Sequence, residues 1–207
     1  MGLSDITVLL DAIHRKTGLV TFHSGNPTAG RKNNGFDSGY AQEQFRKILV
    51  QGVLGEISPA GARKRVRAGR ASGKLVGGNL NCLLKLAGTE YFPQTRGRIL
   101  FLEVFSTPLS ETIFKLTQLR NMGVFNDIVG CVVGYCYSFE HDRQFDVAGR
   151  RVFFEDVLKK LTADKKFPIL KVVDFGHRVP NTFLPIGGEA VVDADKRSFA
   201  LARPYLR

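Results

Sequence analysis

The run from Gly73 to Glu103 constrains the fold of this chain more than any other stretch of its sequence. It contains a glycine loop at residues 77–79 and leads into a strand-like apolar run, Arg98–Phe105. An apolar run bounded by turn signals and followed by a helical pattern predicts a buried strand of a parallel sheet. Ligands of open α/β sheets bind beyond the carboxyl ends of such strands, which makes Glu103 a candidate site residue. Taken alone, this carboxylate is better explained as a residue exposed where the strand leaves the core.

Helical and apolar segments alternate after this strand. A helical pattern begins at Pro108, and the apolar runs Ile128–Cys136 and Pro168–Val173 flank a second helical pattern at Phe153–Leu161. Strand, helix and strand in this order predict right-handed crossover units in a mainly parallel sheet. Two strand patterns within residues 189–202 flank a polar turn and predict a β-hairpin. The fold class predicted from these patterns is α/β.

The first residues predict a helix that begins beside a serine. Apolar residues recur at helical spacing from Ile6 to Ile13, and Gly18 can end the helix. Ser4 is a natural N-cap, because its hydroxyl can accept a hydrogen bond from an amide of the first turn. The same position suits a nucleophile, since the free amides and the helix dipole favour a developing oxyanion there. The local pattern alone favours the N-cap.

Residues 52–72 form the loosest segment, punctuated by glycine and containing a basic cluster at residues 63–70. Such a segment predicts an interdomain linker. The chain carries a net charge of +11, and strongly basic chains often bind nucleic acid. Because no aromatic residues are interleaved with the basic ones, a solvated surface is favoured here over a nucleic-acid site.

Composition excludes several other classes of protein. A chain of 207 residues with 43% hydrophobic and 24% charged residues is typical of a globular protein. It contains no run of eighteen apolar residues, so no membrane-spanning segment is expected. The three cysteines, Cys82, Cys131 and Cys136, lack metal-ligand spacing, and the first residues lack a basic secretory leader. We therefore expect a cytoplasmic protein with free thiols, no metal site and no cofactor.

Several short motifs in a fixed order carry a family resemblance. They are GLSDIT (2–7), GKLVGGNL (73–80), GTEYFP (88–93), GRILFLE (97–103), LTQLRNMG (116–123) and FGHRVPNTFLPIG (175–187). In this order and spacing they resemble the serine L,D-carboxypeptidases, or muramoyl-tetrapeptide carboxypeptidases, and the related microcin C self-immunity hydrolases. The resemblance extends over essentially the whole chain but only over the later part of the family's sequence.

The resemblance implies a catalytic triad of Ser4, Glu103 and His177, in the chain order serine, acid, histidine. Ser4 would be the nucleophile, His177 the general base and Glu103 the carboxylate that orients the imidazole. Without the resemblance, His177 is better explained as a surface histidine whose hydrogen bonds are satisfied.

Three further residues are expected to contribute to the site. The backbone N–H of Asp5 is expected to stabilise the oxyanion, at the start of the first helix. Asn79 and Gly78 are expected to contact substrate, because a glycine loop can approach a ligand closely. Asn79 is equally well explained as a left-handed loop residue.

The resemblance also implies a division of the chain. Residues 1–51 correspond to the C-terminal remnant of an α/β nucleophile domain, 52–72 to the linker, and 73–207 to a C-terminal α/β domain with a mainly parallel sheet. Family members carry a longer segment before the nucleophile, with a Gly-Gly turn that contributes to the oxyanion hole. Here the serine is the fourth residue. Losing one oxyanion donor costs on the order of 10²–10³ in rate.

Three functions are therefore weighed. The first is a serine peptidase that removes the terminal D-alanine from murein tetrapeptide in cell-wall recycling. The second is hydrolysis of a peptidyl-nucleotide antibiotic; it ranks lower because the chain has no Trp to stack on adenine. The third is a catalytically inactive fragment that acts as a binding module. The expected partners are a peptide substrate and a second copy of the chain in a homodimer, with no nucleic acid and no membrane.

Overall fold

The computed structural model describes residues 1–25 and 38–206. Its helices are α1 (Ile6–Thr17), α2 (Gly39–Gln44), the π-helix η1 (Phe45–Val50), α3 (Leu80–Leu84), α4 (Leu109–Asn121), α5 (Val124–Asp127), α6 (Tyr137–Glu140) and α7 (Phe154–Leu161). Its strands are β1 (Thr21–His23), β2 (Gly55–Glu56), β3 (Lys64–Arg67), β4 (Arg70–Asn79), β5 (Arg98–Glu103), β6 (Gly130–Tyr135), β7 (Gln144–Phe145), β8 (Arg151–Val152), β9 (Ile169–Gly176), β10 (Leu184–Ile186), β11 (Glu189–Asp193) and β12 (Ser198–Leu201).

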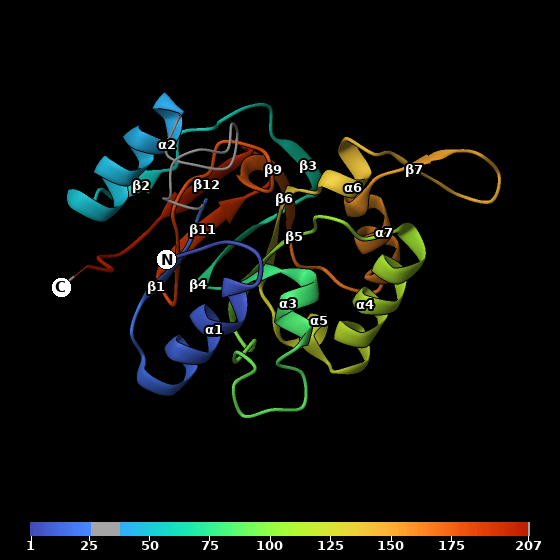
Figure 1. The fold of residues 1–207 in the computed structure, drawn as a ribbon, viewed down its shortest axis with the longest axis horizontal. Helices are drawn as coiled ribbons and strands as arrows, with labels where there is room; N and C mark the ends of the chain where they lie inside the picture. Colours follow the sequence, from blue (N-terminus) through green and yellow to red (C-terminus); the bar gives the residue numbers. More distant parts are fainter. Residues whose placement is uncertain (26–37, 207) are drawn as a thin grey trace.

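An eight-stranded sheet with the order β2-β12-β11-β4-β5-β6-β9-β3 forms the centre of the molecule (Figure 1). The four inner strands β4, β5, β6 and β9 run parallel to one another. The outer strands β11 and β3 pair antiparallel with β4 and β9, so the parallel strands are never at an edge. The predicted α/β class and the predicted hairpin, formed by β11 and β12, are confirmed.

Each face of this sheet is covered by its own hydrophobic core. On one face, Leu100 and Val133 of the sheet pack with residues of α3, α4, α5 and α7. On the other face, Phe101 and Val172 pack with Leu10 of α1, Ile48 of η1 and residues of β10. Inward-facing side chains on both surfaces are what a sheet between two helical layers requires, and they explain the continuous apolar runs of the sequence. In the part of the chain that the structure describes, no helix is both long and apolar enough to cross a membrane.

The N-terminal elements lie beside the end of β4. β1 pairs antiparallel with β10 outside the main sheet, and Gly2 forms a parallel bridge with His23. α1 follows this bridge and ends at Gly18, whose left-handed backbone lets its amide bond to the carbonyl of His14. Three residues, 3–5, therefore connect the bridged residue Gly2 to the start of α1 at Ile6.

Residues 52–72, which the sequence predicts to be an interdomain linker, supply β2, β3 and the first residues of β4. Within the basic cluster at residues 63–70, the side chains of Lys64, Arg65 and Arg70 are exposed as expected, whereas Arg63 and Arg67 have partners inside the fold. Arg63 is buried and bonds to Asp174 at 2.7 Å, and Arg67 donates to the carbonyl of Thr162. Partners far along the chain satisfy these charges, which a local pattern does not reveal. The division into 1–51 and 73–207 stays a prediction.

The expected glycine loop at residues 77–79 is instead the last part of the central strand β4. Gly77 has a φ of +125°, and a Cβ there would collide with the carbonyl oxygen of Phe101 on β5. Glycine is required at this position because β4 and β5 approach each other closely. From the sequence alone, glycines that allow two strands to approach closely cannot be distinguished from glycines in a loop.

Candidate functional site

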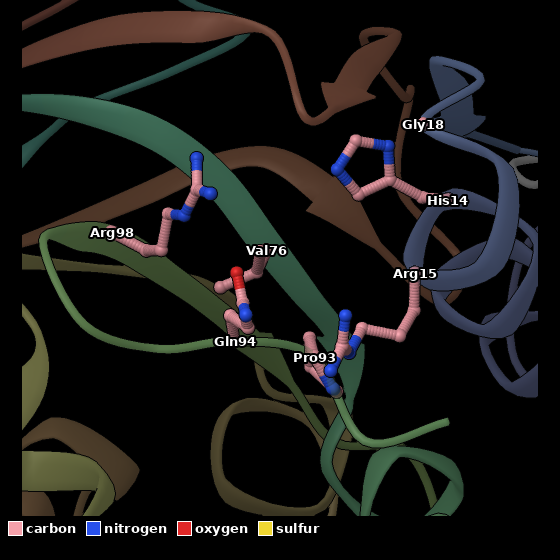
Figure 2. A pocket seen from close by; sticks show the side chains of 7 residues that line it. All are labelled: His14, Arg15, Gly18, Val76, Pro93, Gln94 and Arg98. Carbon is pink, nitrogen blue, oxygen red and sulfur yellow. The ribbon is translucent and has the colours of Figure 1, made fainter. Parts of the chain in front are cut away.

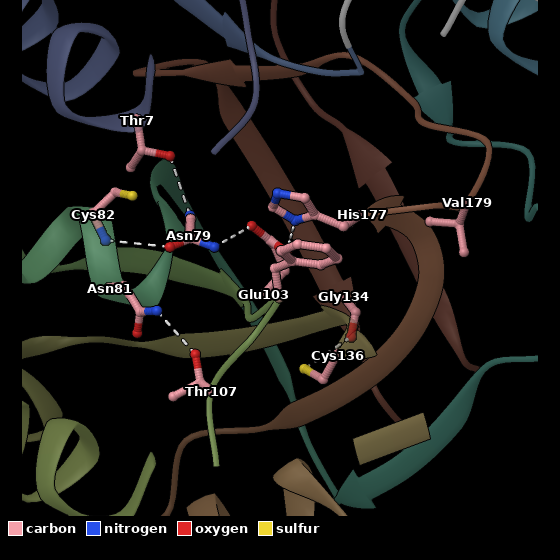
Figure 3. A network of polar contacts seen from close by, with 12 residues as sticks. Thr7, Asn79, Asn81, Cys82, Glu103, Thr107, Gly134, Cys136, His177 and Val179 are labelled. Carbon is pink, nitrogen blue, oxygen red and sulfur yellow. Dashed lines mark hydrogen bonds and ion pairs between the residues drawn. The ribbon is translucent and has the colours of Figure 1, made fainter. Parts of the chain in front are cut away.

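Glu103 and His177 meet at the carboxyl ends of two parallel strands. Glu103 is the last residue of β5, and His177 directly follows β9, on the far side of β6. The Nδ1 atom of His177 lies 2.7 Å from Oε2 of Glu103 (Figure 3). The carboxylate is fully buried and the imidazole nearly so, with its ring stacked on Phe105 at 4.4 Å between centroids. A carboxylate in this position fixes the ring orientation and holds the proton on Nδ1, which leaves Nε2 to act as a base.

Asn79 holds the other oxygen of the carboxylate. Its Nδ2 donates to Oε1 of Glu103 at 2.8 Å, and its Oδ1 accepts from the amide of Cys82 as the N-cap of α3. The side chain is buried and bonded on both of its polar atoms. In this arrangement Asn79 positions Glu103, and the left-handed loop conformation is excluded because its φ is −68°. A substrate contact from Asn79 stays a prediction.

Ser4 lies in the sharp turn between Gly2 and α1. Its φ is +61°, one of the few positive values at a non-glycine residue among those described. Two backbone hydrogen bonds hold Gly2 beside β1. Its amide donates to the carbonyl of Phe22, and its carbonyl accepts from the amide of Ser24. The N-cap position belongs to Asp5 and has no side-chain cap, so the structure does not place Ser4 as the cap. A strained strand–turn–helix connection is also the geometry that exposes the nucleophile in α/β-hydrolases.

Two contacts join this turn to the rest of the site. Thr7, one turn into α1, accepts the amide of Asn79 on its hydroxyl at 3.2 Å. The Asp5 carboxylate accepts from Cys82 and Lys85, and these hydrogen bonds are the main reason that its pKa is lowered. Within the described residues, Ser4 and His177 make no direct hydrogen bond.

Gly78 and His23 pack against each other behind the turn. A Cβ on Gly78 would lie 2.7 Å from the Thr7 side chain and 3.2 Å from Nδ1 of His23, so glycine is needed for packing of α1 and β1. The His23 ring is fully buried against the edges of Phe101 and Phe175, and burial lowers its pKa to about 4. Neither ring nitrogen of His23 has a partner in the part of the chain that is described. This neutral imidazole thus packs between Gly78 of β4 and the rings of Phe101 and Phe175.

Asp11 is a second buried polar group on the same helix, one turn beyond Thr7. Burial raises the pKa of its carboxyl to about 8, and the nearby amide of Gly77 opposes this shift. Thr7 thus lies against the amide of Asn79, and Asp11 against the amide of Gly77. In the described part of the chain β11 pairs only with residues 70–74 of β4, so α1 takes the place of a neighbouring strand here. Between residues 1–25 and 38–206, no three His, Cys, Asp or Glu side chains are grouped so that they could hold a metal ion.

Comparison with known proteins places this site in a family. Residues 72–192 match the LD-carboxypeptidase C-terminal domain, a segment that includes Asn79, Glu103 and His177. This chain belongs to the LD-carboxypeptidase family. The resemblance inferred from the motifs is therefore confirmed.

Named members of the LD-carboxypeptidase family match almost the whole chain. The Microcin C7 self-immunity protein MccF of Escherichia coli is 29% identical over 100% of this chain and 66% of its own length. A probable murein peptide carboxypeptidase of Bacillus subtilis (strain 168) is 28% identical over 95% of this chain and 60% of its own length. The chain thus spans less than two thirds of these relatives.

A solved structure of an LD-carboxypeptidase family member agrees with the fold. The Microcin C7 self immunity protein MccF in complex with aspartyl sulfamoyl adenosine superposes with a TM-score of 0.82 at 26% identity. The match covers 100% of this chain and 68% of the other. A mixed α/β architecture with a large central sheet is therefore shared.

Thr7, His23 and Asp11, which lie around the serine turn and the end of β4, were not predicted from the sequence as parts of the site. Thr7 was visible within the motif GLSDIT, but its partner Asn79 is 72 residues away in the chain. His23 follows a short strand, as a surface histidine also can, and only the packing of Phe101 and Phe175 shows its burial. Asp11 interrupts the helical pattern beside Leu10, and this isolated polar residue was the one available signal.

Proposed function

We propose that this chain carries the triad of a serine hydrolase, with Ser4 as nucleophile, His177 as general base and Glu103 as the residue that orients the base. The observation that carries the proposal is the 2.7 Å contact between His177 Nδ1 and Glu103 Oε2 at the strand ends. The left-handed backbone of Ser4 at the start of α1 supports it. A carboxylate, an imidazole and a hydroxyl near one another are the components that nucleophilic acyl transfer requires.

The reaction follows from where each proton is held. With the Nδ1 proton shared with Glu103, Nε2 of His177 accepts the proton of Ser4 as its oxygen bonds to the substrate carbonyl carbon. The amide of Asp5 has no acceptor among the described residues and would bond to the oxyanion. The C–N bond then breaks, and the leaving amine takes the proton from Nε2. Water, activated by His177, hydrolyses the acyl-enzyme and restores the Ser4 hydroxyl.

For the substrate we propose the L,D-peptide bond to the terminal D-alanine of murein tetrapeptide, cleaved during cell-wall recycling. The similarity to a probable murein peptide carboxypeptidase of Bacillus subtilis supports this choice. A second candidate is an aminoacyl- or peptidyl-nucleotide. It is favoured by the shared fold with MccF, a protein solved in complex with aspartyl sulfamoyl adenosine.

The test is release of D-alanine from purified murein tetrapeptide, compared with hydrolysis of an aspartyl-nucleotide. We expect release from the tetrapeptide by the chain, and loss of about 10⁴-fold or more in the Ser4→Ala variant. Ser110→Ala, at an exposed position of α4, is the matched control and should keep full turnover.

Preferential cleavage of the nucleotide substrate would reverse the ranking of the two substrates. Turnover that survives Ser4→Ala would contradict the triad itself. Absence of turnover on both substrates in a folded sample would favour the third function, an inactive binding module.

A further inference from the structure

A small hollow lies at the opposite end of the first helix from Ser4. It has a volume of about 120 Å³ and is bounded by the last turns of α1, by β4 at Val76 and by the segment before β5 (Figure 2). Arg15, Gln94 and Arg98 extend around it, and the ring of His14 forms another wall (Figure 2). The hollow exists because β11 pairs only with residues 70–74 of β4, so that α1 and a loop cover the remainder of that edge.

The walls of this hollow are held by contacts of their own. The His14 ring packs against Gly187, where a Cβ would collide with it, and its Nδ1 lies 2.9 Å from the carbonyl of Leu19. On the other side, the amide of Gly97 bonds to the carbonyl of Asp127 at 2.9 Å. The amide of Arg98 closes a turn with Thr95. A ligand would therefore meet a site that is largely formed before binding.

The charges around the hollow are of one sign. No carboxylate lines it, and the guanidinium groups of Arg15 and Arg98 have no ion pair or hydrogen bond with any described residue. The neighbouring acids already have other partners. These pairs are Glu90 with Lys16, Asp127 with Arg96 and Glu189 with Arg203. Among the described residues, Arg15, Arg98 and the amide of Gln94 thus remain as side-chain donors without an acceptor.

We propose that this hollow is a binding site for a small oxyanion, a phosphate or carboxylate group. Arginine recognises such groups through two parallel N–H donors, and the Gln94 amide adds a neutral donor. The site is separate from the triad. Arg98 precedes Glu103 by five residues of β5, about 16 Å, and Arg15 follows Ser4 by eleven residues, about 16 Å along α1.

The experiment is a titration of the ¹⁵N-labelled chain with inorganic phosphate, and separately with acetate, at constant ionic strength. We expect saturable shifts of the Gly18 and Gln94 amide signals. Arg98→Gln and Arg15→Gln should each weaken binding at least about tenfold. Arg46→Gln removes the same charge from an exposed site on η1 and should leave the affinity unchanged.

The two ligands distinguish the source of the oxyanion. Saturation by phosphate alone would assign the site to phosphate groups, and saturation by both would assign it to oxyanions generally. Shifts that do not saturate with either ion, or the same affinity in Arg98→Gln and the parent chain, would overturn the proposal. The result does not depend on hydrolysis, so it can fail or succeed whatever the outcome at Ser4.

Discussion

The strand ends that carry Glu103 and His177 differ from the helix that carries Ser4 in how their buried polar groups are satisfied. Both oxygens of Glu103 are bonded, and the buried Asp174 on β9 is paired with Arg63. On α1 and β1, by contrast, Asp11 and His23 are buried without a hydrogen-bond partner among the described residues. Removing a buried charge that is paired destabilises the fold, because its partner is left unpaired. Removing a buried group that has no partner stabilises the fold, because the cost of burying it disappears.

The exposed apolar side chains do not separate the two regions. Leu9 of α1 is 55% exposed and Phe114 of α4 is 73% exposed, while Leu10 of α1 and Leu116 of α4 are buried. The difference between the regions therefore lies in how their buried polar groups are paired. Glu103 and His177 are thus held by paired buried groups, whereas the serine turn is held by a few contacts such as that of Thr7 with Asn79.

The largest effect is expected from Glu103→Gln. The amide would present an N–H to Nδ1 of His177 and favour the wrong tautomer, so turnover should fall about 10⁴-fold with little change in fold. Steady-state hydrolysis measures this, with Glu111→Gln on the exposed side of α4 as control. A modest loss of less than tenfold would mean that the 2.7 Å contact does not position the base.

Next in size is the effect of Asp174→Asn on stability. This change leaves the buried Arg63 without its main counter-charge, which should lower the free energy of unfolding by about 3 kcal/mol or more. Urea denaturation at neutral pH measures the difference. An unchanged midpoint would show that the C-terminal region does not depend on its paired charges.

The same chemical change in the first helix should have the opposite sign. The pKa of Asp11 is raised to about 8, so the folded state holds a proton that the unfolded chain loses near pH 4. Stability should therefore fall as the pH rises from about 4 to about 8. Asp11→Asn should remove this pH dependence. Its free energy of unfolding should exceed that of the parent chain by on the order of a few kcal/mol at pH 9 and equal it at pH 4.

Urea denaturation of the parent chain and Asp11→Asn at pH 5, 7 and 9 checks this expectation. A gain that does not grow with pH would mean that the carboxyl is not buried as a neutral group. If Asp11→Asn and Asp174→Asn changed the free energy of unfolding in the same direction, the proposed difference between the two regions would be wrong.

The smallest effect is expected at Thr7. Thr7→Val removes the acceptor for the buried amide of Asn79 at nearly constant volume, which should cost about 1–3 kcal/mol. Thr112→Val is the matched control, because the buried hydroxyl of Thr112 has no partner in the described part of the chain. Thermal unfolding of both variants should separate them by several degrees. Equal melting temperatures would show that Thr7 does not hold the serine turn.

The sequence could predict those parts of the fold that depend on local patterns. Apolar runs near 98–105, 128–136 and 168–173 correspond to β5, β6 and β9, and the first helix ends at Gly18 as expected, although its N-cap is Asp5 and not Ser4. The positions of Glu103 and His177 at the ends of such runs were predicted in the same way, but the local pattern alone favoured an exposed carboxylate and a surface histidine, and their expected roles rested on the family resemblance. Ser4 required the family resemblance, because a serine before a helix is usually a cap.

What the sequence could not predict depends on contacts between distant residues. Gly77 of β4 is required by the close approach of β5. Arg63, just before β3, pairs with Asp174, and Arg67 of β3 donates to the carbonyl of Thr162, both partners lying about 100 residues away. Neither feature has a periodic signal. The roles of Thr7 and Asn79 likewise become visible only when α1 lies against the end of β4.

The most direct test of the central claim is covalent labelling of Ser4 by a fluorophosphonate, read by intact-mass and peptide mass spectrometry. An activated serine attacks phosphorus and expels fluoride, whereas an ordinary hydroxyl does not react. We predict one adduct per chain, located on Ser4, that is lost in Ser4→Ala and strongly slowed in His177→Ala. No adduct on a folded chain, or labelling at the same rate in His177→Ala, would contradict the account.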